Sequence, residues 1–462
     1  MASLTPFGHP MKKHFLIDPN YRNLNHGSFG AFPYQVQNTQ RSVQDALERQ
    51  PDVFFRYTQP KLVDASRAAL ASLLNAPVTN CVLVKNATTA VNTVLHNLIF
   101  TNTLSPGDAV IYFDYVYGGI ARTLYALREA HPGIQIRRVK YTFPLADGGE
   151  RELVRRFSET VEEVRRSGLR PRLAIFETIV SNPGMRMPFE ELIGECRELG
   201  VLSLVDGAHG VGQLKLDLGR LDPDFFTSNC HKWLFTPRSC ALFYVAARHH
   251  HLIRTSLPTS WGYVPPSPSG GEEGEEEDFS SVFPDRGTSP FVTLFDFVGT
   301  ADDSAYACVP AALEFRQDVC GGEERIHAYI ERLALEGGEV VAAHLGTDVL
   351  RAVRGEEGGL GCAMSNVRLP VRVLSASESA PRVGEEGVLY VWKADVSGLS
   401  LWMEEQMVAK GTFVPVFSHG EWMYIRLSAQ VYLEVSDFEW LAGVLDEILG
   451  SVGGYLEGLH RT

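Results

Sequence analysis

One stretch of sequence, residues 201–237, decides the fold: it reads VLSLVDGAHGVGQLKLDLGRLDPDFFTSNCHKWLFTP. The apolar run at 201–205 is typical of a strand buried on both faces of a parallel sheet, and Asp206 follows it directly. Asp206 therefore lies just past the carboxyl end of a strand, where open α/β sheets bind their ligands. Lys232 follows later in the stretch. The stretch predicts an α/β protein with a ligand site at this edge.

Lys232 and Asp206 together supply what pyridoxal 5'-phosphate (PLP) requires of a protein. A buried lysine loses its proton more readily, and its neutral amine can form a Schiff base with the cofactor's aldehyde. A carboxylate can hold the cofactor's protonated ring nitrogen. Each residue alone has an ordinary explanation, a helix-capping acid or a surface lysine. Because the two occur in one stretch, the pattern favours PLP as the cofactor.

The stretch resembles the class V aminotransferase family of fold-type I PLP enzymes, which includes cysteine desulfurases and isopenicillin N epimerase. The resemblance extends from about Leu24 to Leu427, nearly the whole chain. It implies an α/β fold-type I enzyme with a large domain, built on a mostly parallel sheet of seven strands, and a smaller α+β domain. We expect an N-terminal arm over 1–35, the large PLP-binding domain over 36–308 and the small domain over 309–462.

Composition limits the partners and the compartment. The net charge of −14 includes a run of acids at 272–278, so the rest of the chain is only mildly acidic and nucleic-acid and membrane partners are not expected. This run lies in a segment, 264–284, that is poor in apolar residues and is predicted to be a disordered surface insertion. Seven scattered cysteines without zinc spacing, and the lack of a signal peptide or apolar span, favour a cytoplasmic protein without a metal site.

Two turns after predicted strands carry candidate cofactor ligands. Thr88 and Thr89 begin a helix after the strand at 81–84, and a helix N-terminus offers free N–H donors to a phosphate. Thr88 is alternatively a plain N-cap. Tyr117 follows the strand at 109–113 and can stack on a pyridine ring, with Tyr115 as the weaker candidate.

The resemblance assigns further cofactor contacts. It implies that Asn182, in a Ser-Asn-Pro-Gly turn, bonds the 3-oxygen of the cofactor, and that His209 contacts the ring or its oxygen. An Asn-Pro-Gly turn without a ligand is the alternative for Asn182. Asn229 and His231 correspond to phosphate ligands, although Asn229 stands where the desulfurase motif has serine. Thr300, in a Gly-Thr pair, is implied to reach the phosphate of the neighbouring subunit, so we expect a homodimer with shared active sites.

A second set of residues is expected to bind the substrate. Arg426 lies in an apolar strand, and its planar guanidinium suits a carboxylate; it matches the family's arginine for the substrate α-carboxylate, with an ordinary ion pair as the alternative. Asn25 and His26 belong to LNHGSFG, a motif that lies beside the active site in the epimerase-like branch. A substrate with a trimethylammonium group would require aromatic neighbours for that group. A substrate with a second carboxylate would require a cation for that carboxylate. The candidates for these contacts are Phe55, Arg56, Tyr57, Trp261 and Tyr263, although such aromatic residues are more often core.

These roles define a reaction class. Lys232 is the expected base for the Cα proton, Asp206 keeps the ring nitrogen protonated, and Tyr117 can protonate the leaving group. No cysteine occurs at 397–411, where a desulfurase carries its sulfur acceptor, so persulfide formation is disfavoured. Racemisation, transamination and β-elimination stay open.

The combined motifs look most like fungal members of the epimerase-like branch that act as C–S lyases on hercynylcysteine sulfoxide. This resemblance implies β-elimination of the sulfenate of ergothioneine, with release of pyruvate and ammonia. An epimerase, an aminotransferase or a desulfurase-like enzyme is the alternative within enzymes. A catalytically inactive partner subunit is the alternative outside them, although such a protein would not need Lys232, Asp206 and Arg426 together.

Overall fold

The computed structural model describes residues 4–146, 148–265, 286–353, 359–375 and 387–459. Its larger sheet has seven strands in the order β1-β7-β6-β5-β4-β2-β3. Their bounds are β1 Cys81–Val84, β2 Asp108–Phe113, β3 Gln135–Val139, β4 Arg170–Glu177, β5 Leu202–Asp206, β6 Phe225–Ser228 and β7 Ala241–Val245. Only β7 runs antiparallel to its neighbours in this sheet. The prediction of a mostly parallel seven-stranded sheet is confirmed.

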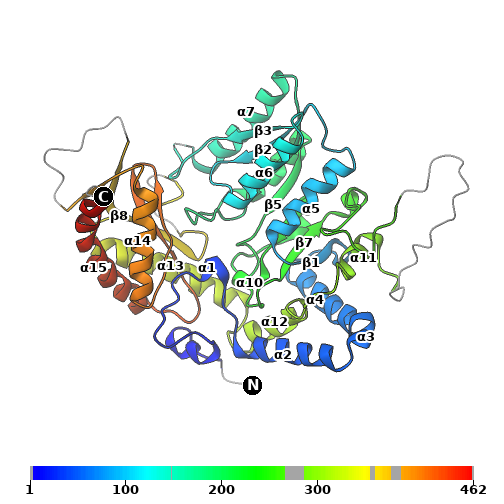
Figure 1. The fold of residues 1–462 in the computed structure, drawn as a ribbon, viewed down its shortest axis with the longest axis horizontal. Helices are drawn as coiled ribbons and strands as arrows, with labels where there is room; N and C mark the ends of the chain where they lie inside the picture. The colour runs from blue at the N-terminus through cyan, green and yellow to red at the C-terminus, as the bar shows by residue number, and fades with distance from the viewer. Residues whose placement is uncertain (1–3, 147, 266–285, 354–358, 376–386, 460–462) are drawn as a thin grey trace, which may run out of the picture.

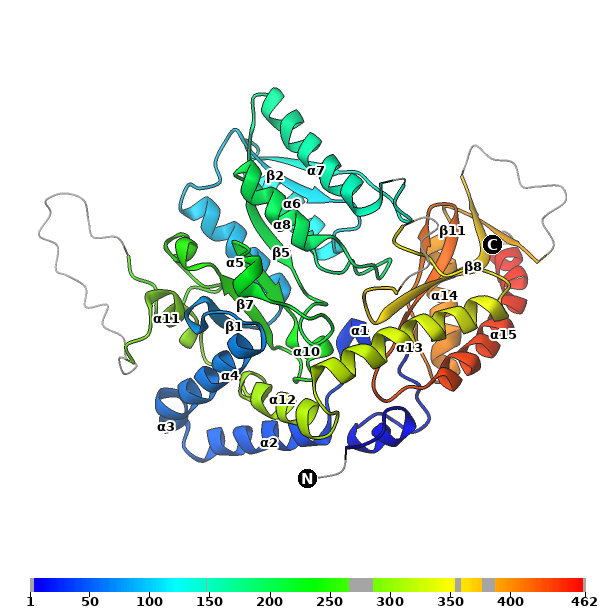
Figure 2. The ribbon, with the colours of Figure 1, turned by 180° about the vertical axis from the view of Figure 1, so that it is seen from behind.

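Helices cover both faces of the larger sheet, which is why its strands are apolar runs (Figure 1). One core contains Val91 and Val94 of α5 (Ala87–Phe100) with Leu124 of α6 (Gly118–Ala130). The core on the other face contains Phe157 of α7 (Gly149–Arg166) and Leu192 of α8 (Phe189–Leu199), helices that lie in front in the reverse view (Figure 2). Shorter helices complete this part: α9 Leu218–Leu221, α10 Cys230–Trp233, η4 Ala247–Leu252 and α11 Pro290–Asp296.

The smaller sheet has the strand order β10-β11-β8-β9 and packs against three helices. The bounds of these elements are β8 Met364–Leu374, β9 Leu389–Trp392, β10 Val416–His419, β11 Trp422–Ser428, α13 Glu323–His344, α14 Val396–Ala409 and α15 Val435–Leu459. Met11, Phe15 and Leu24 of the N-terminal arm enter the same core. The arm is therefore fastened to the C-terminal part of the chain, and it contains helical turns at η1 His9–His14 and α1 His26–Phe29.

The helical segment after the arm lies below the larger sheet in Figure 1. It consists of α2 Tyr34–Arg49, α3 Pro51–Val53, a π-helical turn η2 Phe54–Thr58, α4 Gln59–Leu73 and the short η3 Val78–Asn80. Val36 of α2 packs on Ala312 of α12 (Val309–Asp318), which follows the short η5 Tyr306–Cys308. The helix that follows the predicted domain boundary at residue 309, α12, packs on α2 and α4, and the boundary itself stays a prediction. The predicted insertion lies outside the described residues except for 264 and 265.

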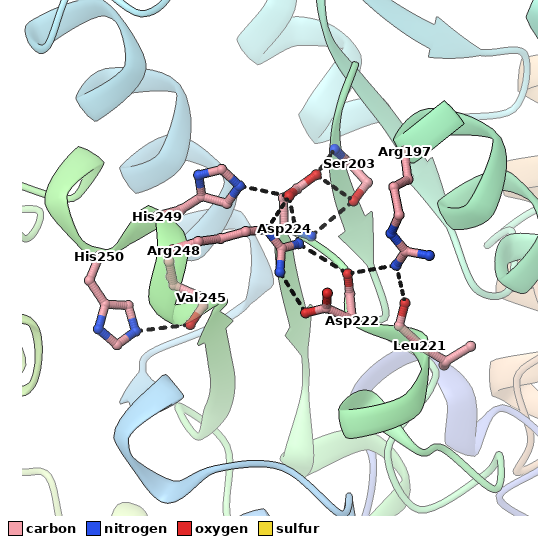
Figure 3. Close-up of polar contacts among 9 residues, drawn as sticks. All are labelled: Arg197, Ser203, Leu221, Asp222, Asp224, Val245, Arg248, His249 and His250. Carbon is pink, nitrogen blue, oxygen red and sulfur yellow. Dashed lines mark hydrogen bonds and ion pairs between the residues drawn. The ribbon is translucent and has the colours of Figure 1, made fainter. Parts of the chain in front are cut away.

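A polar network closes the amino-terminal edge of the larger sheet (Figure 3). The Asp224 carboxylate accepts hydrogen bonds from the Ser203 amide at 2.9 Å, Arg248 Nη2 at 2.8 Å and His249 Nε2 at 2.7 Å. Burial alone would raise the pKa of Asp224, but the bonds from His249, Ser203 and Arg248 lower it to about 2. The network ties β5 to β6 and to η4, on the edge opposite Asp206. Within the described residues, no helix has the length and apolar character to cross a membrane.

Candidate active site

A cavity of about 470 Å³ lies at the carboxyl edge of the larger sheet, where the N-terminal arm and the smaller sheet meet it. The residues predicted from the sequence that line this cavity are Asn25, Thr88, Tyr117, Asn182, Asp206, His209, Asn229, His231, Lys232 and Arg426. They come from both ends of the chain and from segments at the carboxyl ends of β1, β2, β4, β5 and β6. No cluster of described residues in the protein could hold a metal ion.

The Lys232 amine is held by a short chain of polar contacts. Trp233 Nε1 donates to His209 Nδ1 at 3.2 Å, and His209 Nε2 lies 2.9 Å from Lys232 Nζ. An indole nitrogen is only a donor, so His209 Nδ1 accepts and its neutral ring carries the proton on Nε2. That Nε2–H then donates to the Lys232 lone pair. The contacts therefore place Lys232 as a neutral amine.

The electrostatic surroundings of Lys232 and His209 also favour the neutral form of both side chains. Burial, together with the nearby Arg426 cation, lowers the pKa of Lys232 to about 7, although Asp206 opposes the change. Burial holds the pKa of His209 well below its usual value, so the imidazole is neutral at pH 7. A neutral amine is the nucleophilic form that attacks an aldehyde.

Two carboxyl groups stand side by side at the ends of β4 and β5, where Glu177 pairs in register with Asp206. Asp206 Oδ1 accepts the Ala208 N–H at 2.9 Å. Glu177 Oε1 accepts the Tyr117 N–H at 2.7 Å, and its Oε2 is buried without a partner. No sequence motif singled out Glu177 as a site residue. Its position beside Asp206 on the next parallel strand was the available signal.

The N-terminus of α5 forms a candidate phosphate site. Asn86 caps the helix by accepting the Thr89 amide at 2.8 Å, and Asn229 Oδ1 accepts the Ala87 amide at 2.9 Å. Thr88 lines the cavity at this turn, where a helix N-terminus offers N–H donors that suit an anion. The Thr89 hydroxyl also lies within hydrogen-bond distance of Asn86, at 3.1 Å, which turns it away from the cavity. Thr89 therefore takes part in the cap of α5, and its assignment as a phosphate ligand stays a prediction.

His231 lies beside this turn and contacts the Cys240 carbonyl through Nδ1 at 3.0 Å. A carbonyl only accepts, so Nδ1 carries the proton, and burial lowers the pKa of His231 to about 4. The neutral ring presents Nε2 as an acceptor. His231 must gain a proton before it can donate to a phosphate.

Tyr117 stands at the mouth of the cavity, half exposed, as the residue before α6. Gly119 leaves room for its ring, because a Cβ there would lie 2.8 Å from Tyr117 Cε1. Tyr115 instead contacts Thr142 through its hydroxyl at 3.1 Å and does not line the cavity. The structure thus favours Tyr117 over Tyr115 as the aromatic that faces a ligand.

Arg426 is a buried cation without a carboxylate partner among the described residues. Its Nη2 donates to Asn25 Oδ1 and Ser28 Oγ, both at 2.8 Å, and its Nη1 donates to the Ser181 carbonyl at 2.6 Å. These neutral acceptors orient the guanidinium but leave its charge uncompensated, and burial lowers its pKa to about 10. Arg426 Nε is buried without a hydrogen-bond partner among the described residues, so this guanidinium is suited to an anionic ligand.

The other predicted site residues lie elsewhere in this chain. His26 is fully buried, with Nδ1 2.8 Å from the Tyr432 hydroxyl, and does not line the cavity, so its assignment to the substrate stays a prediction. Tyr57 and Trp261 are exposed and do not line the cavity. Arg56 pairs with Asp52 on α3, and Thr300 lies beside Phe55 on the outer surface. A single chain does not bring these four residues to its own cavity.

The fold and the site define a PLP-dependent enzyme of fold type I: the lysine, the strand-end acid and the helix N-terminus fit the aldehyde, ring nitrogen and phosphate of PLP. The chain belongs to the class V aminotransferase family. Residues 55–258 match the family described as aminotransferase class-V.

Curated relatives match nearly the whole chain. The L-cysteine desulfhydrase-like protein lolT1 of Epichloe uncinata is 41% identical over 453 residues, covering 96% of both chains. The hercynylcysteine sulfoxide lyase of Schizosaccharomyces pombe is 30% identical over 455 residues, covering 97% of this chain and 99% of the relative. The solved complex of the cystine C–S lyase C-DES with cysteine persulfide has a TM-score of 0.64 at 19% identity and covers 93% of this chain and 98% of that one, which supports the fold.

Proposed function

We propose that the protein is a PLP-dependent C–S lyase that removes the sulfur substituent of a cysteine S-conjugate by β-elimination, with hercynylcysteine sulfoxide as the substrate. The observation that carries this proposal is the unpaired Arg426 guanidinium in the same cavity as the Lys232 amine. An amino-acid carboxylate bound to Arg426 places the substrate's Cα beside this amine. Relatives named for C–S cleavage support the reaction class.

Each residue of the chain has a defined task in this reaction. PLP, when bound, withdraws the electrons left at Cα, so that the Cα proton and then the β substituent can leave. Lys232, once the substrate amine has displaced it, takes the Cα proton. Arg426 holds the carboxylate, and Asp206 holds the ring nitrogen. The Cβ–S bond breaks with its electron pair on the leaving group, which Tyr117 protonates.

The walls of the cavity favour elimination of a bulky conjugate over sulfur transfer to the protein. Phe29, Tyr117 and Phe413 line it, and Phe29 and Tyr117 remain well exposed, so an aromatic surface surrounds the S-substituent. No described cysteine lines the cavity, and Cys362 is buried beside Met364 with a pKa raised by burial to about 12. The three products are the protonated sulfenate (the sulfenic acid), pyruvate and ammonia, with one water consumed after release.

The test is pyruvate release from PLP-loaded protein with hercynylcysteine sulfoxide, with L-cysteine as the comparison. The proposal expects pyruvate from the sulfoxide and little from cysteine. A second candidate, an L-cysteine desulfhydrase, is favoured by the name of the relative at 41% identity and expects sulfide and pyruvate from cysteine. Racemised or transaminated amino acid without pyruvate would overturn both and move the function to the epimerase side.

We also propose that the enzyme works as a homodimer in the cytoplasm. Thr300, Arg56, Tyr57 and Trp261 lie at the surface of one chain, where a second copy could use them. Sedimentation would give the mass of the assembly. If Thr300→Ala weakens PLP binding in a dimer although Thr300 is remote from its own cavity, a shared site is supported. A monomer that binds PLP with full affinity would refute it.

A further inference from the structure

Glu177 and Asp206, the carboxyl pair at the ends of β4 and β5, have different surroundings. Asp206 faces Lys232 and receives an amide N–H from Ala208. Glu177 receives one amide N–H, from Tyr117, and its second oxygen is buried without a partner. Side chains of residues in register on neighbouring parallel strands point to the same side of the sheet. Two acids are thus held together in a nearly dry site, and Glu177 has a buried carboxyl oxygen without a partner among the described residues.

Two carboxylates in such a site do not both ionise, because burial and mutual repulsion penalise the second charge. The groups that face Glu177 are the Asp206 carboxyl and the Tyr117 amide, and the buried Tyr141 phenol lies near it. Burial, followed by the Asp206 charge, raises the pKa of Glu177 well above its usual value. Burial raises the pKa of Asp206 as well, but the Ala208 N–H and the ionised form of Lys232 oppose that change, whereas no described cation opposes the change at Glu177. The proton of the pair therefore belongs on Glu177.

We propose that Glu177 is a neutral carboxylic acid at neutral pH, a positioning residue that anchors the backbone of Tyr117 through Oε1 and leaves Asp206 as the single negative charge of the pair. The proton sits on Oε2, because Oε1 already accepts the Tyr117 N–H at 2.7 Å. Oε2 is buried and has no hydrogen-bond partner among the described residues, which suits a neutral oxygen better than a charged one. Neither step depends on which substrate the enzyme cleaves.

The experiment is infrared spectroscopy of the apo-protein at pH 7, compared with the Glu177→Gln variant. A protonated carboxyl gives a carbonyl band distinct from that of a carboxylate. The proposal expects such a band in the wild type and its loss in Glu177→Gln. The control is Glu152→Gln, because Glu152 is held by Arg155 and Arg156 on the surface with its pKa lowered to about 2. This control should remove no band of a protonated acid.

A second readout uses the visible band of the lysine-bound cofactor. Glutamine is neutral and keeps an oxygen for the Tyr117 amide, so Glu177→Gln should bind PLP within about twofold of wild type and keep the pH midpoint of this band. Glu177→Ala should bind PLP less tightly, because the turn that carries Tyr117 loses its anchor. An ionised Glu177 would instead make Glu177→Gln lower the midpoint by about one unit or more, since a nearby negative charge is lost.

Either that downward shift or the absence of a protonated glutamate in wild-type protein would overturn the proposal. The test for a protonated glutamate does not depend on whether a variant folds, because uniform ¹³C labelling of glutamate reports on the wild-type protein directly. A failure to cleave cysteine conjugates would leave both readouts unaffected.

Discussion

Trp233 and His209 are joined by a hydrogen bond of 3.2 Å from the indole Nε1 to the imidazole Nδ1, and this bond fixes which nitrogen of His209 faces Lys232. The tryptophan is fully buried and follows the lysine directly in sequence. One residue therefore packs the core while it also sets the protonation of the nucleophile's neighbour. Because these contacts favour the neutral Lys232 amine, the protonation state of Lys232 can be tested by experiment.

The rate of PLP attachment to the apo-enzyme should depend on the ionisation of Lys232. Burial lowers the pKa of this amine to about 7, so the neutral, reactive form grows as pH rises through 7 and is nearly complete by about pH 8. Stopped-flow absorbance after addition of PLP measures this rate. A midpoint near the ordinary lysine value of 10.5 would contradict the contacts described above. Lys232→Ala should show no attachment at any pH.

Replacement of Arg426 should weaken the interaction with the substrate carboxylate. Arg426→Lys keeps the charge but loses the planar fork, and Arg426→Ala loses both, so kcat/KM should fall by about 10-fold and about 1000-fold respectively. PLP binding should change far less, because the cofactor is held by other residues. Steady-state kinetics and PLP titration separate the two effects. Equal losses in both assays would mean that Arg426 mainly maintains the fold.

Gly30→Ala should disturb the loop that carries Lys232. Gly30 has a φ of 67°, and an added Cβ would overlap with the backbone carbonyl of His231, so the arm and the lysine loop could not keep their contact. We expect a loss of PLP affinity and a decrease of about 2 kcal/mol or more in the free energy of unfolding. The control is Gly168→Ala, where φ is 77° but no atom lies within 4 Å of the added Cβ. This control should cost about 1 kcal/mol from backbone strain and leave PLP affinity unchanged.

Asp224 should stabilise the protein in a pH-dependent way. Its pKa in the folded protein is about 2, below the 3.8 of the free group, so its contribution is fully present above pH 3.8 and disappears as pH falls through 2. This difference between the two pKa values corresponds to about 2 kcal/mol in the free energy of unfolding. Urea unfolding of Asp224→Asn should show this loss at pH 7 and a much smaller one near pH 2. An equal loss at both pH values would indicate a packing defect instead.

The sequence by itself determined the parallel sheet and the cofactor, and it predicted the position of the nucleophile. Each rests on local information: an apolar run that ends in Asp206, a helix start at Thr88, and Lys232 within a motif. Parallel strands end at one edge, so residues at strand ends converge without further knowledge of the fold. Arg426 was also predicted, because a strand arginine among apolar residues must meet an anion or an ion-pair partner.

Only the tertiary structure decided which neighbours face the cavity and which turn away. Thr89 and His26 are adjacent in sequence to lining residues, Thr88 and Asn25, yet their polar atoms bond to Asn86 and Tyr432. The chemical environment of Glu177 depends on Asp206, which lies twenty-nine residues later in sequence and is its register partner on the neighbouring strand. Hydrogen-bond partners, burial and the charge of a nearby group depend on long-range packing. A local motif does not contain this information.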